Sequence, residues 1–92
     1  MKRVRDLITD ADQLRAELAP RNIALDDFVA HLWAAHSRMK SGDDADNLRA
    51  YTKNLEADRL DLKRTVVWLL SISNFLKQLN PSIQDIEIGK ES

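Results

Sequence analysis

The chain has 92 residues, a formal net charge of −1, 43% hydrophobic residues and 32% charged residues. A chain of this length forms one small domain, and two glycines and two prolines are too few for a turn-rich β fold or a disordered chain. Because cysteine is absent, disulfides, thiolate metal sites and cysteine nucleophiles are excluded.

The N-terminus does not have the pattern of a secretory signal. Its basic start is followed at once by Asp6, Asp10 and Asp12, where a signal peptide has an apolar segment. The apolar run at residues 66–72 is far shorter than the ~20 residues that span a bilayer. We therefore expect a soluble, cytoplasmic protein with no membrane partner.

The first predicted helix covers residues 3–19. Apolar residues recur every three or four positions, as on one face of a helix, and these are Val4, Leu7, Ile8, Ala11, Leu14 and Leu18. Pro20 ends this helix, because a residue that precedes proline is disfavoured in the helical conformation.

The second predicted helix covers residues 26–40, with Asp26 or Asp27 as its N-cap. Its apolar face is wide and includes Phe28 and Trp33, which indicates a middle helix that touches two neighbours. Gly42 follows as a helix terminator.

The third predicted helix is long and covers residues 43–79. Leucine recurs in it every seven residues, which is two helical turns, so the five leucines lie along one side: Leu48, Leu55, Leu62, Leu69 and Leu76. Pro81 stops the helix, and residues 81–92 form a tail with a short helical turn or strand and a frayed end. The sequence thus predicts one helical domain, 1–80, and a tail, 81–92.

The predicted fold is an all-α bundle in which the two shorter helices pack on the long one. The second half of the long helix is apolar on nearly every face, and one short helix cannot cover it. We therefore expect a homodimer, and its predicted interface consists of Val66, Val67, Trp68, Leu70, Ile72, Asn74, Phe75 and Leu79. The polar residues within this dry stretch allow two interpretations: the serine and threonine side chains bond to the backbone carbonyl one turn back, or Asn74 meets its symmetry mate and fixes the register.

Candidate catalytic and metal sites are weak. His31 and His36 are five residues apart and lie on different faces of one helix, which does not suit a shared metal. The acidic run at residues 43–46 lacks the glycine and glutamate of a calcium loop, so we interpret it as helix capping. No phosphate-binding loop, nucleophile elbow or zinc motif is present, and we predict no enzyme activity, no metal and no cofactor.

The remaining candidates are surfaces for a partner. A wide aromatic stripe and a basic concentration on the long helix suggest the partner-binding residues Phe28, Trp33, Arg59, Lys63 and Arg64. The basic residues alternate with acidic ones, so the same stretch also fits a solvated, salt-bridged face.

No part of the sequence resembles a known family closely enough to name one. The leading hypothesis is a non-enzymatic, dimeric regulator or inhibitor that binds another protein. The alternative is a DNA-binding regulator that uses the basic face of the long helix or the basic N-terminus with Lys2, Arg3 and Arg5. The third hypothesis is an enzyme or a small-ligand carrier with a pocket inside the bundle.

Overall fold

The computed structural model describes residues 2–17, 23–40 and 42–88, without the side chain of Ile23. Helices account for most of these residues, which confirms the predicted small all-α bundle. The elements in chain order are β1 (Lys2–Arg3), α1 (Asp6–Glu17), α2 (Ile23–Arg38), α3 (Asp43–Ala57), α4 (Leu62–Lys77), α5 (Pro81–Gln84) and β2 (Glu87–Ile88).

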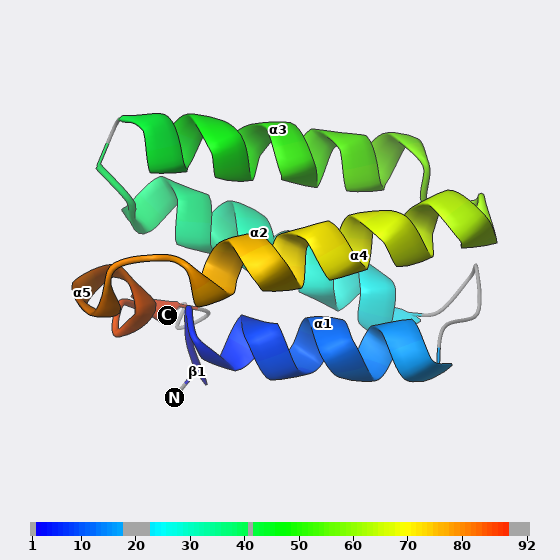
Figure 1. The fold of residues 1–92 in the computed structure, drawn as a ribbon, viewed down its shortest axis with the longest axis horizontal. Helices are drawn as coiled ribbons and strands as arrows, with labels where there is room; N and C mark the ends of the chain where they lie inside the picture. The colour runs from blue at the N-terminus through cyan, green and yellow to red at the C-terminus, as the bar shows by residue number, and fades with distance from the viewer. Residues whose placement is uncertain (1, 18–22, 41, 89–92) are drawn as a thin grey trace.

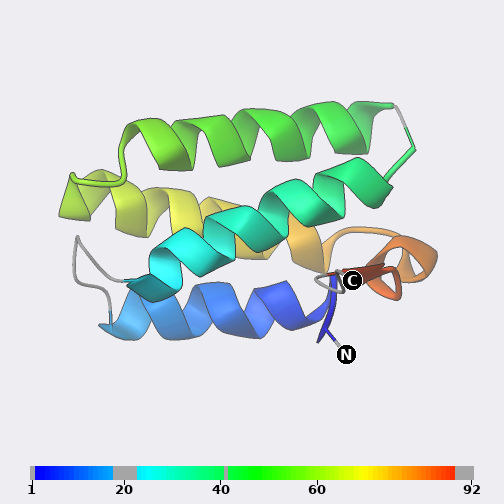
Figure 2. The same ribbon diagram turned by 180° about the vertical axis from the view of Figure 1, so that it is seen from behind.

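Helices α1 to α4 form an up-and-down four-helix bundle (Figure 1). Helix α2 packs against α1 and α3, and α4 packs against the same two helices. Seen from the two sides, α4 lies on one broad face of the molecule and α2 on the other, with α1 and α3 at the edges (Figures 1 and 2). Each long helix therefore has two neighbours and keeps an outer face.

The expectation of one continuous helix over residues 43–79 is wrong, because the chain reverses at residues 58–61. A straight helix of that length would span about 55 Å, whereas the molecule measures 32 Å along its longest axis. Folding back gives α3 and α4 15 and 16 residues, close to the 16 of α2. The two halves cover each other, and this replaces much of the covering that we had assigned to a second copy.

Two aspartates hold this reversal. Asp58 is the C-cap of α3, its backbone carbonyl accepts a 2.8 Å bond from Thr65 Oγ1, and its carboxylate accepts a 2.7 Å bond from Trp68 Nε1. Asp61 is the N-cap of α4, where its side chain accepts a 3.1 Å bond from the N–H of Arg64. Neither glycine nor proline is needed for a turn made in this way.

The leucine repeat is therefore not one seam. Leu48 and Leu55 on α3 and Leu69 on α4 are fully buried, as is Leu76. Leu62, the middle member, begins α4 directly after the turn of the hairpin and is 44% exposed. The repeat therefore runs through two antiparallel helices that are joined by a turn.

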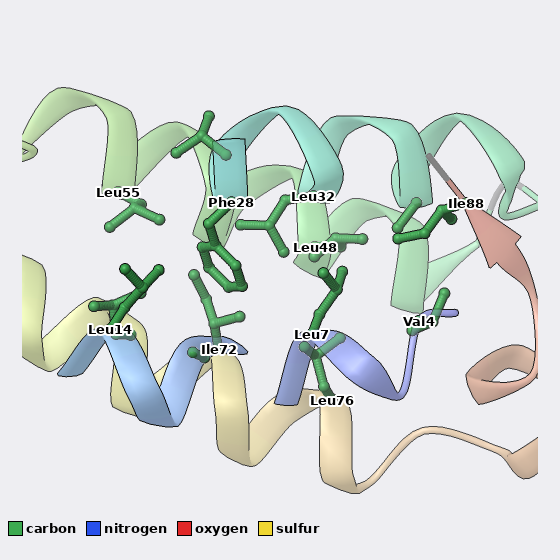
Figure 3. Close-up of a cluster of buried hydrophobic side chains, with 14 of the residues drawn as sticks. Val4, Leu7, Leu14, Phe28, Leu32, Leu48, Leu55, Ile72, Leu76 and Ile88 are labelled. Atoms are coloured by element: carbon green, nitrogen blue, oxygen red, sulfur yellow. The ribbon is translucent and has the colours of Figure 1, made fainter. Parts of the chain in front are cut away.

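The core lies between the four helices and extends toward the chain ends. Figure 3 shows Leu7 and Leu14 from α1, Phe28 and Leu32 from α2, Leu48 and Leu55 from α3, and Ile72 and Leu76 from α4 converging, with Val4 and Ile88 at one end. All ten are buried. Each helix contributes one apolar stripe, as the spacing of its residues predicts.

Both ends of the chain join the bundle through a two-stranded antiparallel sheet, in which Lys2 pairs with Ile88 and Arg3 with Glu87. The pairing continues as Val4 N–H donates to the carbonyl of Ile86 at 2.9 Å. Helix α1 therefore starts at Asp6 and not at residue 3. The tail contains both the short helical turn and the strand that the sequence left open, and its end at 89–92 lies outside the described residues.

The start of α2 and the start of α3 also differ from expectation. Helix α2 begins at Ile23, so Asp26 lies in its first turn and is not the N-cap. The N-cap of α3 is Gly42, with φ 147° and ψ −175°, a region that only glycine adopts readily. Asp43, Asp44 and Asp46 occupy the first turn, where carboxylates favour the helix dipole, but no side chain caps this helix end.

Candidate interaction surface

The outer face of α4 carries two exposed large apolar side chains. Val67 is 57% exposed and Leu70 is 44% exposed. They lie three residues apart, so they are neighbours on the helix surface, opposite the buried stripe that contains Ile72 and Leu76. We call Val67 and Leu70, with the exposed residues Lys63, Asn74 and Lys77 on the same side of the helix, the α4 ridge.

The α4 ridge is basic. Helix α4 contains Lys63, Arg64 and Lys77 and no acidic residue. Within the described chain, no carboxylate makes an ion pair with either lysine, and the guanidinium of Arg64, 70% exposed, is 3.7–3.8 Å from the nearest carboxylate oxygens. The two lysines are therefore available to an anionic partner, and Arg64 is partly engaged by Asp58 and Asp61.

A surface hollow of about 290 Å³ lies beside the ridge, lined by Asp58, Lys63, Arg64, Val67 and Trp68. Asp58 is already bonded to the indole N–H of Trp68 at 2.7 Å, so its charge is partly engaged. Val67 and Trp68 contribute apolar surface to the lining, and Lys63 and Arg64 contribute the cations. This combination accommodates an apolar side chain next to a carboxylate.

Aromatic packing between α3 and α4 holds the Trp68 side chain that lines the hollow. The Trp68 ring makes an edge contact with Tyr51 of α3, with ring centroids 6.4 Å apart, and Tyr51 contacts Phe75 at 5.3 Å. These half-buried aromatic rings pack α3 against α4 and fix the Trp68 side chain.

The residues predicted as a dimer interface separate into three groups. Val67, Leu70 and Asn74 are exposed, and Val66, Trp68 and Phe75 are half-buried at the helix flanks. Ile72 and Leu79 are buried in the core of the single chain, so their assignment to an interface is wrong for this fold. They fill the bundle interior because α3 folds back over α4.

The predicted partner-binding residues separate in the same way. Phe28 is buried, and Trp33 is half-buried against His36 at a centroid distance of 5.8 Å, so neither makes an open aromatic stripe. Arg59 forms an ion pair with Asp26 of α2. Only Lys63 and Arg64 remain at the surface hollow, next to Val67.

The basic N-terminus is engaged in ion pairs. Lys2 Nζ is 2.6 Å from the carboxylate of Asp10, Arg3 pairs with Glu87 at 3.9 Å, and Arg5 pairs with Asp85. These contacts tie the first residues to α1 and to the tail. They leave no unpaired basic stripe at the sheet.

The other surface hollows that we find in the described part of the chain do not bring together the side chains of a catalytic or metal site. A hollow of about 230 Å³ between α1 and α2 is lined by Lys2, Asp10, Asp27 and His31, and there Lys2 and Asp10 neutralise each other. In the described ranges, no three His, Asp or Glu side chains come close enough to share a metal ion. None of the helices there has the length and apolar character that a bilayer crossing requires.

Sequence reasoning missed Leu60 and the role of Asp58. Leu60 is 71% exposed at the tip of the α3–α4 turn. Asp61 stands directly before the apolar run that begins at Leu62, which is where an N-cap aspartate occurs, and this was a signal in the sequence for a second helix start.

Comparison with protein-family models, with curated proteins and with solved structures finds no match to this chain. We therefore infer its function from the residues of the chain alone.

Proposed function

We propose that this chain is a cytoplasmic, non-enzymatic protein-interaction module, a small regulator or inhibitor that binds another protein through the α4 ridge. The observation that carries the proposal is the exposure of Val67 and Leu70 at the centre of the outer face of a helix whose other side fills the core. Exposed apolar residues at helical spacing, with a hollow beside them, fit the docking of a partner helix.

The positive charge of the ridge favours a partner with negative charge. Lys63 and Lys77 flank the apolar residues at the two ends, and no carboxylate of the described residues pairs with either lysine, whereas Arg64 forms ion pairs with Asp58 and Asp61 at 3.8 and 3.7 Å. A partner helix with an apolar stripe bordered by Asp or Glu would match both features, because opposite charges raise the association rate and fix the orientation. Two copies joined through this ridge would instead bring six cations together.

The alternative, DNA binding, has less support. The predicted basic face is divided, because Arg49 and Lys53 lie on α3 while Lys63 and Arg64 begin α4. The N-terminal cations and Arg59 already pair with carboxylates. A duplex-binding surface needs a continuous stripe of available cations.

The test is a selection of helical peptides from a randomised display library against the immobilised protein, followed by affinity measurement with the enriched peptides. We expect peptides with an apolar stripe and acidic flanks, and affinity that falls as salt rises. Substituting Val67 and Leu70 by serine, or Lys63 and Arg64 by glutamate, should weaken binding at least about tenfold, corresponding to ~1.4 kcal/mol.

The matched control is the double substitution of Arg49 and Lys53 by glutamate, which makes the same charge change on the outer face of α3. It should leave the affinity for the selected peptides within about twofold, a fraction of the ~1.4 kcal/mol that a tenfold change represents. Enriched peptides that are basic, or that bind the Val67 and Leu70 variant as well as the parent, would refute the proposal.

A further inference from the structure

The turn between α3 and α4 exposes apolar side chains and contains no helix-breaking residue. Of the four large apolar side chains that are exposed in the described chain, Leu60 and Leu62 lie in this turn or at its edge, 71% and 44% exposed. Residues 58–61 contain neither glycine nor proline, and the described non-glycine residues have no positive φ. The turn therefore contains no strong helix breaker, and its two middle residues, Arg59 and Leu60, are good helix formers.

The phase of the apolar residues is also compatible with a continuous helix. Leu55, Leu62 and Leu69 are spaced by seven, so in a straight helix they lie along one side. The two outer members are buried in the bundle, and only Leu62 is exposed. Straightening of the turn would place Leu62 in line with two core residues.

We infer that the α3–α4 turn is a hinge through which two copies of this chain exchange α4 and the tail. In the exchanged dimer, α3 and α4 of each copy form one helix, and α4 packs on α1 and α3 of the other copy. Every helix contact of the single chain is kept, now partly between chains, which is why exchange of an element is a low-cost route to a dimer. The two long helices lie antiparallel, and Leu62 continues their shared apolar seam across the junction.

The closed and exchanged forms differ mainly in the turn. The closed form has the 2.7 Å bond from Trp68 Nε1 to Asp58, the 2.8 Å bond from Thr65 Oγ1 to the Asp58 carbonyl, and the Asp61 cap. The exchanged form gains helical hydrogen bonds through residues 58–61 and burial of Leu62. Asp58 and Asp61 thus set the balance, and their removal favours exchange.

The experiment refolds the full chain from denaturant at micromolar and at millimolar concentration and measures mass by light scattering. Cysteines at positions 46 and 77, both exposed, carry spin labels, because the chain has no cysteine of its own. They belong to the first turn of α3 and the last turn of α4, and these two helix ends lie at the same end of the closed bundle (Figure 1). In a continuous helix the two labels of one chain are about 47 Å apart. The labelled chain is mixed with an excess of unlabelled chain before refolding, so that a dimer contains one labelled copy and only the distance within that copy is measured.

We expect dimer after refolding at high concentration, with the long distance in the dimer and the short one in the monomer. The double variant Asp58→Ala and Asp61→Ala should increase the dimer fraction at least about threefold. Leu60→Pro should abolish it, because proline breaks a continuous helix, while the turn N–H bonds come from Arg59 and Asp61. Leu60→Gly, which disfavours the helix without constraining the turn, should act in the same direction if the proline variant does not fold.

A chain that stays monomeric at high concentration in the double aspartate variant would overturn the inference. So would a dimer in which the labels remain close together, because that dimer joins closed bundles through their surfaces. Peptide binding at the α4 ridge is measured on the parent monomer with its turn closed, so either outcome is separate from the proposed function.

Discussion

The paired substitutions Leu62→Ala and Leu69→Ala test the fold-back of the leucine repeat. Both remove the same atoms from residues one heptad apart. Leu69 is fully buried, whereas Leu62 is 44% exposed at the start of α4. Truncation of a buried leucine costs ~2–5 kcal/mol, because transfer energy is lost and a cavity remains. At Leu62 much of the side chain is already in water, so we expect about 1 kcal/mol or less.

The magnitudes are large relative to the total stability of such a domain. A chain of this size has an unfolding free energy of about 5–14 kcal/mol, so Leu69→Ala removes a substantial share. Urea denaturation of the monomer, followed by circular dichroism, gives both values, and a loss of 2 kcal/mol lowers the melting temperature by at least about 8 °C. Equal losses for the two variants would show that Leu62 is buried like Leu69, and would refute the hairpin.

Four further substitutions test individual contacts by the same denaturation assay. Ser73→Ala should stabilise the chain by about 1 kcal/mol, since the buried Ser73 hydroxyl has no hydrogen-bond partner among the described residues; a loss of stability would indicate a partner. Gly42→Ala should cost about 1–3 kcal/mol through the backbone alone, because no atom lies within 4 Å of the added methyl group, and an unchanged midpoint would argue against φ 147° at this residue. Asp58→Ala should cost about 1–3 kcal/mol and be non-additive with Trp68→Phe, because the two side chains share one hydrogen bond; additive losses would exclude that bond. Ile88→Ala should cost about 2–5 kcal/mol, since Ile88 is 1% exposed, and a negligible effect would mean that the tail does not pack on the core.

The sequence predicted the helices and most of their inner faces. The three- and four-residue spacing of Leu7, Ala11 and Leu14 places them on one face of α1, and all three are buried. The leucines of the heptad repeat, apart from Leu62, are in the core as well. Periodicity carries this information because each helix buries one stripe.

The sequence did not predict the turn at residues 58–61, for a physical reason. No glycine or proline marks it, and the apolar phase continues through it from Leu55 to Leu69. Its stabilisation comes from Asp58, whose bond to Trp68 joins residues ten positions apart and leaves no local pattern. Tertiary contacts of this kind override local propensity.

The predicted interaction residues were derived from a wrong helix length, and their role in binding stays a prediction. A continuous helix would leave Ile72 and Leu79 uncovered, and the hairpin buries both. Val67, Leu70, Lys63 and Arg64 remain on the surface, because they point away from the bundle. The homodimer itself stays a prediction, now expressed as exchange through the hinge.

The most direct test of the central claim, that the α4 ridge binds a partner helix, is an NMR titration of the labelled protein with a selected acidic peptide. The chain has two tryptophans, and only Trp68 lines the hollow beside Val67, while Trp33 lies on α2. We predict that the Trp68 indole N–H signal and the amides of residues 63–74 shift with the peptide while the Trp33 signal stays in place. Shifts confined to α2, or an unchanged Trp68 signal at saturating peptide, would contradict the account.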